Sequence, residues 1–130
     1  MKPVVFVVED DADVRQSLEF LVASFGYVVR AFDSADSFLD SSDAAQPDCL
    51  VVDFRFPNMD GLQQYDLLAA RNATIPMIFL TGDFSEKLRR ETRKRGITNV
   101  LEKPCSSDAL YEKIKLAMND EAILRHGNNG

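Results

Sequence analysis

Cysteine and histidine are almost absent from this sequence, which removes several kinds of site at once. The two cysteines, Cys49 and Cys105, provide neither a disulfide framework nor the ligand spacing of a metal site. The single histidine, His126, stands near a Gly/Asn-rich end without a nucleophile signature, so a hydrolase triad has no support. Cys49 begins an apolar run, and we expect it to be a small buried hydrophobic residue.

Long hydrophobic runs are also missing. No stretch approaches the roughly 20 apolar residues that a membrane span needs, and the apolar run after Pro3 is too short for a signal peptide. The net charge of −6 and the pI near 4.7 argue against nucleic-acid binding by the chain as a whole. We therefore expect one cytosolic (cytoplasmic) domain of 130 residues, with no membrane contact and no direct nucleic-acid contact.

What the sequence does contain is a regular alternation of apolar runs and helical patterns. Strands are predicted at 4–8, 27–32, 49–52, 75–80 and 97–101. Helices are predicted after each strand: one ending before Gly26, one at 34–42, one across 62–69, one at 85–95, and one from 107 to about 124. Parallel strands joined by right-handed helical crossovers form a doubly wound α/β sheet with helices on both faces.

Polar residues follow these strands at the carboxyl ends, where doubly wound sheets bind ligands. In chain order they are Glu9, Asp10, Asp11, Asp53, Thr81, Glu102 and Lys103, with Gly82 directly after Thr81. Crowded carboxylates repel one another unless a cation joins them. A few oxygen ligands with room for water suit Mg²⁺, or Mn²⁺ in its place.

Asp53 is the clearest candidate for chemistry, because a buried strand leads directly into it and a desolvated carboxylate is costly unless it is used. A carboxylate can be the nucleophile of phosphoryl transfer. The transferred oxygens then need positive charge and hydrogen-bond donors, which the metal, Lys103 and the Thr81 hydroxyl supply. No general base is required, since the carboxylate is already ionised.

Four stretches in this order and at this spacing resemble the response regulator receiver domain of two-component signalling, the CheY-like family. They are VVFVVEDDADVR, LVVDFRFPNMDG, IFLTG and VLEKP. The resemblance covers essentially the whole chain, with 1–120 as the receiver and 121–130 as a helix extension or the start of a linker. It implies a flavodoxin-like fold with five parallel strands in the order 2-1-3-4-5.

The same resemblance implies a signalling phosphoacceptor rather than an enzyme. It implies that Asp53 takes a phosphoryl group from a sensor histidine kinase or phosphotransfer protein, with Thr81 and Lys103 on that group. The implied metal ligands are Glu9, Asp10, Asp53 and the backbone carbonyl of Arg55. A cis peptide bond between Lys103 and Pro104 is implied as well.

Several positions are expected to tune switching. Receivers usually carry an aromatic residue three positions before the lysine, and here that position is Val100. Gly82 leaves space for a phosphoryl group. Arg55 and Asp83 each follow a site residue by two positions, where opposite charges would pair and hinder the attacking water.

The predicted helix 85–95 is crowded with Lys and Arg, and Leu88 is its only clearly apolar residue. We expect it to be the most mobile helix, since little apolar area anchors it. Its basic face is either merely solvated or part of a surface, 85–120, that contacts an effector or a second copy of the chain.

Two other functions stay open at this point. An aspartyl-phosphate phosphatase or phosphotransferase is disfavoured, because no second acid stands two residues after Asp53 and no substrate-capping insertion is present. A receiver-like interaction module that works without phosphorylation is the remaining alternative.

Overall fold

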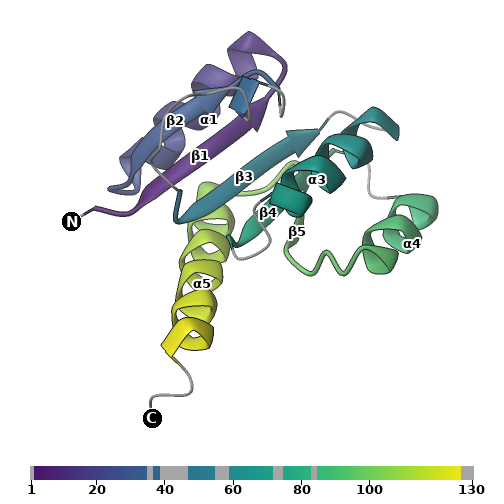
Figure 1. Ribbon diagram of the computed structural model, residues 1–130. Coiled ribbons are helices and arrows are strands. Elements are labelled where there is room, and N and C mark those ends of the chain that lie inside the picture. The colour runs from purple at the N-terminus through teal and green to yellow at the C-terminus, as the bar shows by residue number, and fades with distance from the viewer. Residues whose placement is uncertain are drawn as a thin grey trace.

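Strands and helices alternate along the chain, as the periodicity predicts (Figure 1). The structure is a computed structural model that describes residues 2–34, 37–38, 47–54, 59–71, 75–82 and 85–126, with side chains except at 54, 59–61, 64, 68, 71 and 120–126. Its elements are β1 (Val4–Glu9), α1 (Ala12–Ser24), β2 (Val28–Phe32), β3 (Cys49–Phe54), α3 (Met59–Arg71), β4 (Met77–Thr81), α4 (Glu86–Lys94), β5 (Val100–Glu102) and α5 (Ser107–His126). Most of the helix predicted at 34–42 lies outside the described residues.

The five strands form one parallel sheet in the order β2-β1-β3-β4-β5, which confirms the predicted fold class and strand order. In the register of this sheet, Glu9 at the end of β1 pairs with Asp53 of β3, and Asp53 pairs with Leu80 of β4. The carboxyl ends of the three central strands therefore meet at one edge, where the predicted site residues lie.

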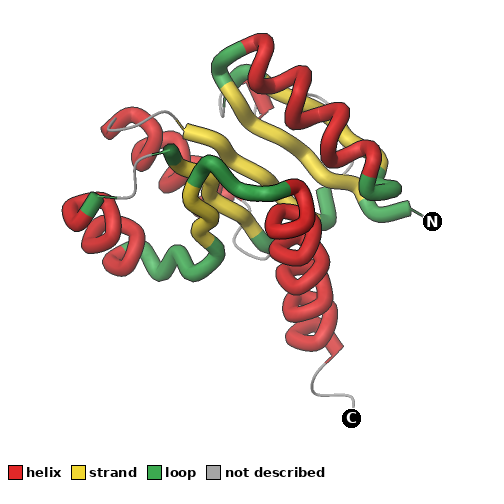
Figure 2. The backbone as a smooth tube through the Cα atoms, turned by 180° about the vertical axis from the view of Figure 1, so that it is seen from behind, coloured by secondary structure: helices red, strands yellow, loops and turns green. Residues whose placement is uncertain are grey.

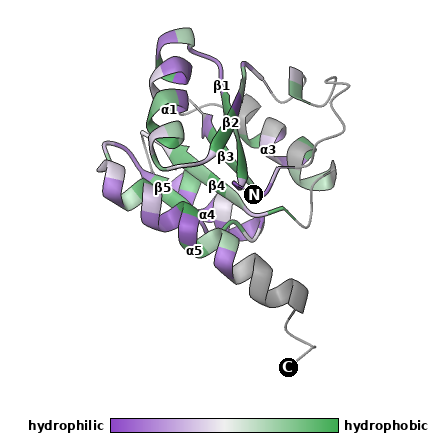
Figure 3. Cartoon of the chain, turned by 90° about the vertical axis from the view of Figure 1, so that its left-hand side faces the viewer, coloured by the Kyte–Doolittle hydropathy of each residue, from purple (hydrophilic) through white to green (hydrophobic). Residues whose placement is uncertain are grey.

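Helices cover both faces of the sheet. The view from behind shows α1 and α5 lying across one face, with α3 and α4 on the other side (Figure 2). The central strands are hydrophobic along their length, as strands buried on both faces must be (Figure 3).

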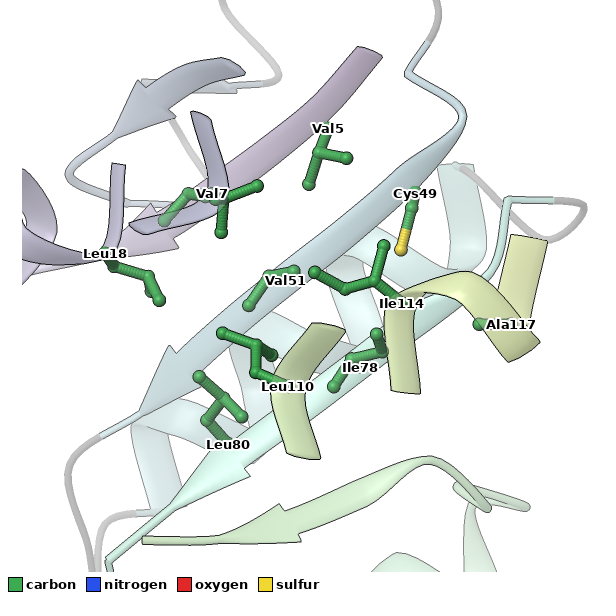
Figure 4. Close-up of a cluster of buried hydrophobic side chains, with 11 residues drawn as sticks. Val5, Val7, Leu18, Cys49, Val51, Ile78, Leu80, Leu110, Ile114 and Ala117 are labelled. Atoms are coloured by element: carbon green, nitrogen blue, oxygen red, sulfur yellow. The ribbon is translucent and has the colours of Figure 1, made fainter. Parts of the chain in front are cut away.

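Alternating strand side chains build two separate cores. On the α1/α5 face, Val51 and Ile78 pack with Leu110 and Ile114 of α5 (Figure 4). Cys49 belongs to this core and is fully buried, which confirms its predicted place. The opposite core is made by alternate strand residues with Phe38, Leu62 of α3 and Leu88 of α4.

Local geometry defines where α1 begins and where α1 and α4 end. The Asp11 side chain accepts hydrogen bonds from the backbone N–H groups of Asp13 and Val14, so it is the N-cap of α1. Gly26 follows α1 with φ +99°, and Gly96 follows α4 with φ +71°. Both glycines adopt the left-handed conformation that commonly ends a helix.

The third strand, predicted at 49–52, extends to Phe54, and the predicted starts of the fourth and fifth strands are wrong. The fourth strand begins at Met77 rather than at 75, and the fifth runs Val100–Glu102 rather than 97–101. Ile75 and Ile97 are nonetheless buried in the core next to α3 and α4. The Ile97 N–H donates to the Thr92 carbonyl at the end of α4, 2.9 Å away, so the residue packs while still part of a helix end. The sequence pattern did not distinguish these buried apolar residues from residues of a strand, because both are hydrophobic.

No helix in the described parts of the chain is both long and apolar enough to cross a lipid bilayer.

Candidate functional site

The site is centred on two acidic residues on neighbouring strands. Glu9 and Asp53 are register partners at the ends of β1 and β3, and they are only 1% and 3% exposed. Strand alternation puts both side chains on the α1/α5 face, since Asp53 follows Cys49 and Val51 in that row. Two carboxylates are thus held side by side in a water-poor environment.

Lys103 brings the positive charge. Its Nζ lies 2.8 Å from Asp53 Oδ2, in a contact that spans 50 residues of sequence. The backbone fixes the approach, because the Lys103 N–H donates to the Thr81 carbonyl at 2.7 Å. The peptide bond from Lys103 to Pro104 is cis, as the resemblance implied.

Glu9 has strongly altered acidity. The pKa of Glu9 is raised from 4.5 to about 8, mainly because the side chain is buried, and the neighbouring carboxyl groups of Asp10 and Asp53 contribute to this rise. One hydrogen bond opposes the shift, because the Asp11 N–H donates to Glu9 Oε1 at 2.9 Å. Without a cation, this end of the sheet therefore holds a proton at neutral pH.

One oxygen of Glu9 and one of Asp53 show whether the site fits a metal ion. Among the described residues, neither Glu9 Oε2 nor Asp53 Oδ1 has a hydrogen-bond partner, although both are buried. Buried polar atoms are rarely left unpaired unless a ligand, an ion or water uses them. Anionic oxygens of this kind suit a hard divalent cation such as Mg²⁺.

The other predicted ligands are Asp10 and the backbone carbonyl of Arg55. Asp10 is exposed, and Arg55, whose backbone carbonyl the resemblance implied as a ligand, lies outside the described residues. Within the ranges that the structure describes, no three Asp, Glu, His or Cys side chains are arranged to hold a metal ion. The fit to Mg²⁺ thus depends on the Glu9–Asp53 pair, with other ligands to complete it.

Thr81 reaches the same edge but sits differently from Asp53. It is the last residue of β4, pairs in register with Phe54, and is fully buried. Alternation along β4 puts it in the row of Phe79, on the α3/α4 side of the sheet. Gly82 follows it in open space, since an added Cβ there would meet nothing within 4 Å.

The positions expected to tune switching are only partly described. Val100 pairs with Phe79 and packs against the α3/α4 core. Pro104 is exposed after its cis bond. Asp83, like Arg55, lies outside the described residues.

A cavity of about 260 Å³ opens beside the Asp53–Lys103 pair. Its walls come from Val14, Leu18 and Leu21 of α1, with Cys105 and Leu110 on the other side. Burial raises the pKa of the Cys105 thiol, and the nearby Lys103 opposes that shift. The Asp53 carboxylate is therefore approached along a mainly apolar wall.

The comparisons with known proteins agree with this geometry. The family model for the response regulator receiver domain matches residues 5–115. The chain belongs to the response regulator receiver family. It is a signalling domain of two-component response regulators.

Curated relatives support the same family. The chain is 36% identical to the transcriptional regulatory protein FixJ of Bradyrhizobium diazoefficiens, over 88% of this chain and 56% of that protein. It is 37% identical to the transcriptional regulatory protein TdiR of Thauera aromatica, over 88% of this chain and 50% of that protein. The chain thus spans about half the length of the curated relatives that it matches.

Solved structures agree as well. Full-length FixJ from B. japonicum superimposes with a TM-score of 0.78 at 35% identity, covering 93% of this chain and 60% of that chain. A CheY-like receiver domain from Methanospirillum hungatei shares the fold at 20% identity, with a TM-score of 0.81 over 94% of this chain and 98% of that chain.

Proposed function

We propose that Asp53 is the phosphoacceptor of this receiver domain, and that phosphorylation in the presence of Mg²⁺ switches its conformation. The observation that carries this proposal is the asymmetric environment of the Asp53 carboxylate. Oδ2 is held by the Lys103 ammonium, whereas Oδ1 is buried without a hydrogen-bond partner in the described part of the chain. A carboxylate oxygen that is held in place and has no hydrogen-bond partner among the described residues is a ready nucleophile.

The transfer step follows from this arrangement. A phosphohistidine on a sensor histidine kinase or phosphotransfer protein is the donor. An Asp53 oxygen forms a bond to phosphorus while the phosphorus–nitrogen bond of the donor breaks, and the electron pair leaves with the imidazole. Bound Mg²⁺ supplies positive charge that offsets the negative charge of the phosphoryl oxygens. Glu9, Asp10 and Asp53 would hold that ion, together with the Arg55 carbonyl.

Lys103 and Thr81 act on the phosphoryl group from two directions. Lys103 already contacts Asp53, so its ammonium needs little movement to pair with a phosphoryl oxygen. Thr81 starts in the row of Phe79 on the opposite side of the sheet, and its hydroxyl has to turn toward the edge to donate. Thr81 therefore couples phosphorylation to a change near α4, where Val100 and Gly82 set the available space.

The switched state then acts through contacts made by 85–120, with an effector or a second copy as the partner. Arg55 and Asp83 tune how long the phosphoryl group survives hydrolysis. The receiver comprises 1–120, and the continuation of α5 to His126 supports a helical extension after it. A cytoplasmic location is consistent with membership of the receiver family.

Intact mass spectrometry tests the proposal. The wild-type chain, treated with Mg²⁺ and a small acyl phosphate, should gain the mass of one phosphoryl group. Asp53→Asn should gain none, whereas Asp13→Asn, an exposed acid in the first turn of α1, should behave as wild type. An unmodified wild-type chain would favour the alternative, an interaction module that works without phosphorylation.

A further inference from the structure

Arg15 lies in the first turn of α1, beside the acidic end of β1. Its Nη1 donates to the Glu9 carbonyl at 3.0 Å and approaches the Asp10 carbonyl at 3.5 Å. The backbone of Arg15 is fixed too, because its N–H donates to the Asp11 carbonyl at 2.8 Å in the first turn of α1. A single side chain thus contacts the main chain of both acids at the end of β1.

These contacts join a small network that determines the shape of the loop from β1 to α1. Glu9 Oε1 accepts from the Asp11 N–H, and the Asp11 side chain caps α1. The Arg15 side chain therefore binds the carbonyl groups of Glu9 and Asp10, and the Glu9 side chain binds the N–H group of Asp11. Fixing these peptide planes fixes the direction in which both acidic side chains leave the backbone.

The type of acceptor that Arg15 uses is informative. Arginine normally pairs with carboxylates through its planar fork, yet this contact is with carbonyl oxygens, and Glu9 Oε2 stays without a donor among the described residues. Lys103 differs, because it donates directly to a carboxylate oxygen of Asp53. Arg15 places positive charge near the acids without occupying the oxygens that a cation would need.

The Arg15 guanidinium also interacts electrostatically with Asp33, the residue that follows β2. The Ser37 hydroxyl lowers the pKa of Asp33 by a hydrogen bond, and the Arg15 guanidinium lowers that pKa further. Arg15 therefore lies between the ends of β1 and β2, next to the edge where the site is built.

We propose that Arg15 is a positioning residue for the divalent cation of the phosphoacceptor site, acting through the main-chain carbonyls of Glu9 and Asp10. This inference rests on the proposed function, since it assigns Arg15 a role in that same site. Groups that orient metal ligands typically change metal affinity by about 10- to 100-fold when they are removed.

Calorimetric Mg²⁺ titration of the unphosphorylated chain tests the proposal, because the direction of the change in Mg²⁺ affinity separates two effects of removing Arg15. Removing a positive charge near a cation site would by itself tighten Mg²⁺ binding, whereas losing the ligand arrangement weakens it. We expect Arg15→Gln to weaken binding by about tenfold. Arg15→Lys keeps the charge but loses the fork, and its affinity should fall between those of Arg15→Gln and wild type. Arg90→Gln, on the exposed face of α4, makes the same charge change far from the site and should match wild type.

Amide hydrogen exchange with a chelator present provides a readout that needs no metal. In Arg15→Gln the Asp11 amide, which donates to Glu9, should exchange faster, while amides in α5 keep their wild-type rates. At saturating Mg²⁺, phosphorylation by the acyl phosphate should return close to the wild-type rate, because the affected quantity is metal affinity.

The outcomes separate the two proposals. A wild-type chain that binds no Mg²⁺ and takes no phosphoryl group contradicts the proposed function and this inference with it. A wild-type chain that does both, with an Arg15→Gln variant whose affinity is unchanged or tighter, overturns only the role of Arg15. If Arg15→Gln loses its far-UV circular dichroism spectrum, the decision passes to Arg15→Lys, and wild-type values for that variant in both readouts overturn the inference.

Discussion

Lys103 holds one carboxylate oxygen of Asp53 at 2.8 Å, while the other oxygen is buried with no hydrogen-bond partner in the described parts of the chain. The Lys103 side chain is 35% exposed and that of Asp53 only 2%. The ion pair therefore has one end in solvent and one in the protein interior, and the interior end pays the larger desolvation cost.

A double-mutant cycle measures this relationship in the metal-free chain. Lys103→Met keeps the stem but removes the charge, so Asp53 is left buried beside Glu9, and we expect a loss of about 1–3 kcal/mol in the free energy of unfolding. With Asp53→Asn in the background, the same lysine change should cost much less. Urea denaturation of the four proteins gives the coupling energy. Equal costs in both backgrounds would mean that the pair does not stabilise the fold.

The pH dependence of stability provides a second prediction, through Glu9. Its pKa is about 8 in the folded protein against 4.5 ordinarily, so between these values the folded state binds more protons than the unfolded state. Stability from this group is full below about pH 4.5 and falls as the pH rises toward 8. Glu9→Gln cannot ionise, so its stability relative to wild type should rise across this window and then level off.

This experiment is denaturant unfolding at several pH values with a chelator present. Glu19→Gln on α1 makes the same change away from the site, and its stability should follow the wild-type curve at a constant offset. Parallel curves for Glu9→Gln and wild type would show that Glu9 ionises normally in the folded chain.

The sequence predicted the strands well where both faces are buried, because such strands are continuous apolar runs. β1 and β3 appear where Val4 and Cys49 begin their runs, and the acids after them arrive at the same edge. The predicted strand boundaries were wrong at Ile75 and Ile97, which lie outside the strands although their side chains are buried. Hydrophobicity reports burial, whereas a strand also requires a hydrogen-bonded neighbour, and that neighbour is set by the tertiary structure.

The sequence predicts which site residues lie at the same edge of the sheet, but it does not predict how they contact one another. The rule that ligands bind at strand ends brings Glu9, Asp53 and Lys103 together. It does not show that Arg15 binds main-chain carbonyls, a contact for which the sequence carried no signal beyond an arginine four residues into the helix region. It also does not show that the strand face shared by Phe79 and Thr81 points toward α3 and α4, which depends on how the helices cover the sheet.

The basic helix α4 leads to a third prediction. Leu88 and Thr92 are its buried side chains, and a bidentate ion pair joins Arg95 just after it to Asp66 of α3 at 2.8 and 3.1 Å. Because Asp66 is 52% exposed, Asp66→Asn should cost less than about 1 kcal/mol of global stability. The amides at the end of α4 should nevertheless exchange faster, because the Arg95–Asp66 ion pair no longer joins this end of α4 to α3.

Hydrogen exchange read by mass spectrometry or NMR resolves this effect by helix. In wild type, α4 should already exchange faster than α1, and Asp66→Asn should widen the difference. Glu112→Gln, an exposed charge change on α5, should leave α4 at its wild-type rate. An α4 as protected as α1 would contradict the view that so few buried side chains leave this helix easy to open.

The packing of α5 gives the last prediction, from two residues that lie two positions apart. Ile114 is fully buried against Val51 and Ile78 (Figure 4). Leu116 is 54% exposed. Ile114→Ala should lower the free energy of unfolding by about 2–5 kcal/mol, because it removes buried methyl groups and leaves a cavity between helix and sheet. Leu116→Ala should change it by less than about 0.5 kcal/mol, since the side chain is already in water. Urea denaturation compares the two directly, and similar losses for both would mean that the face of α5 turned away from the sheet is also buried in solution, for example against a second copy of the chain.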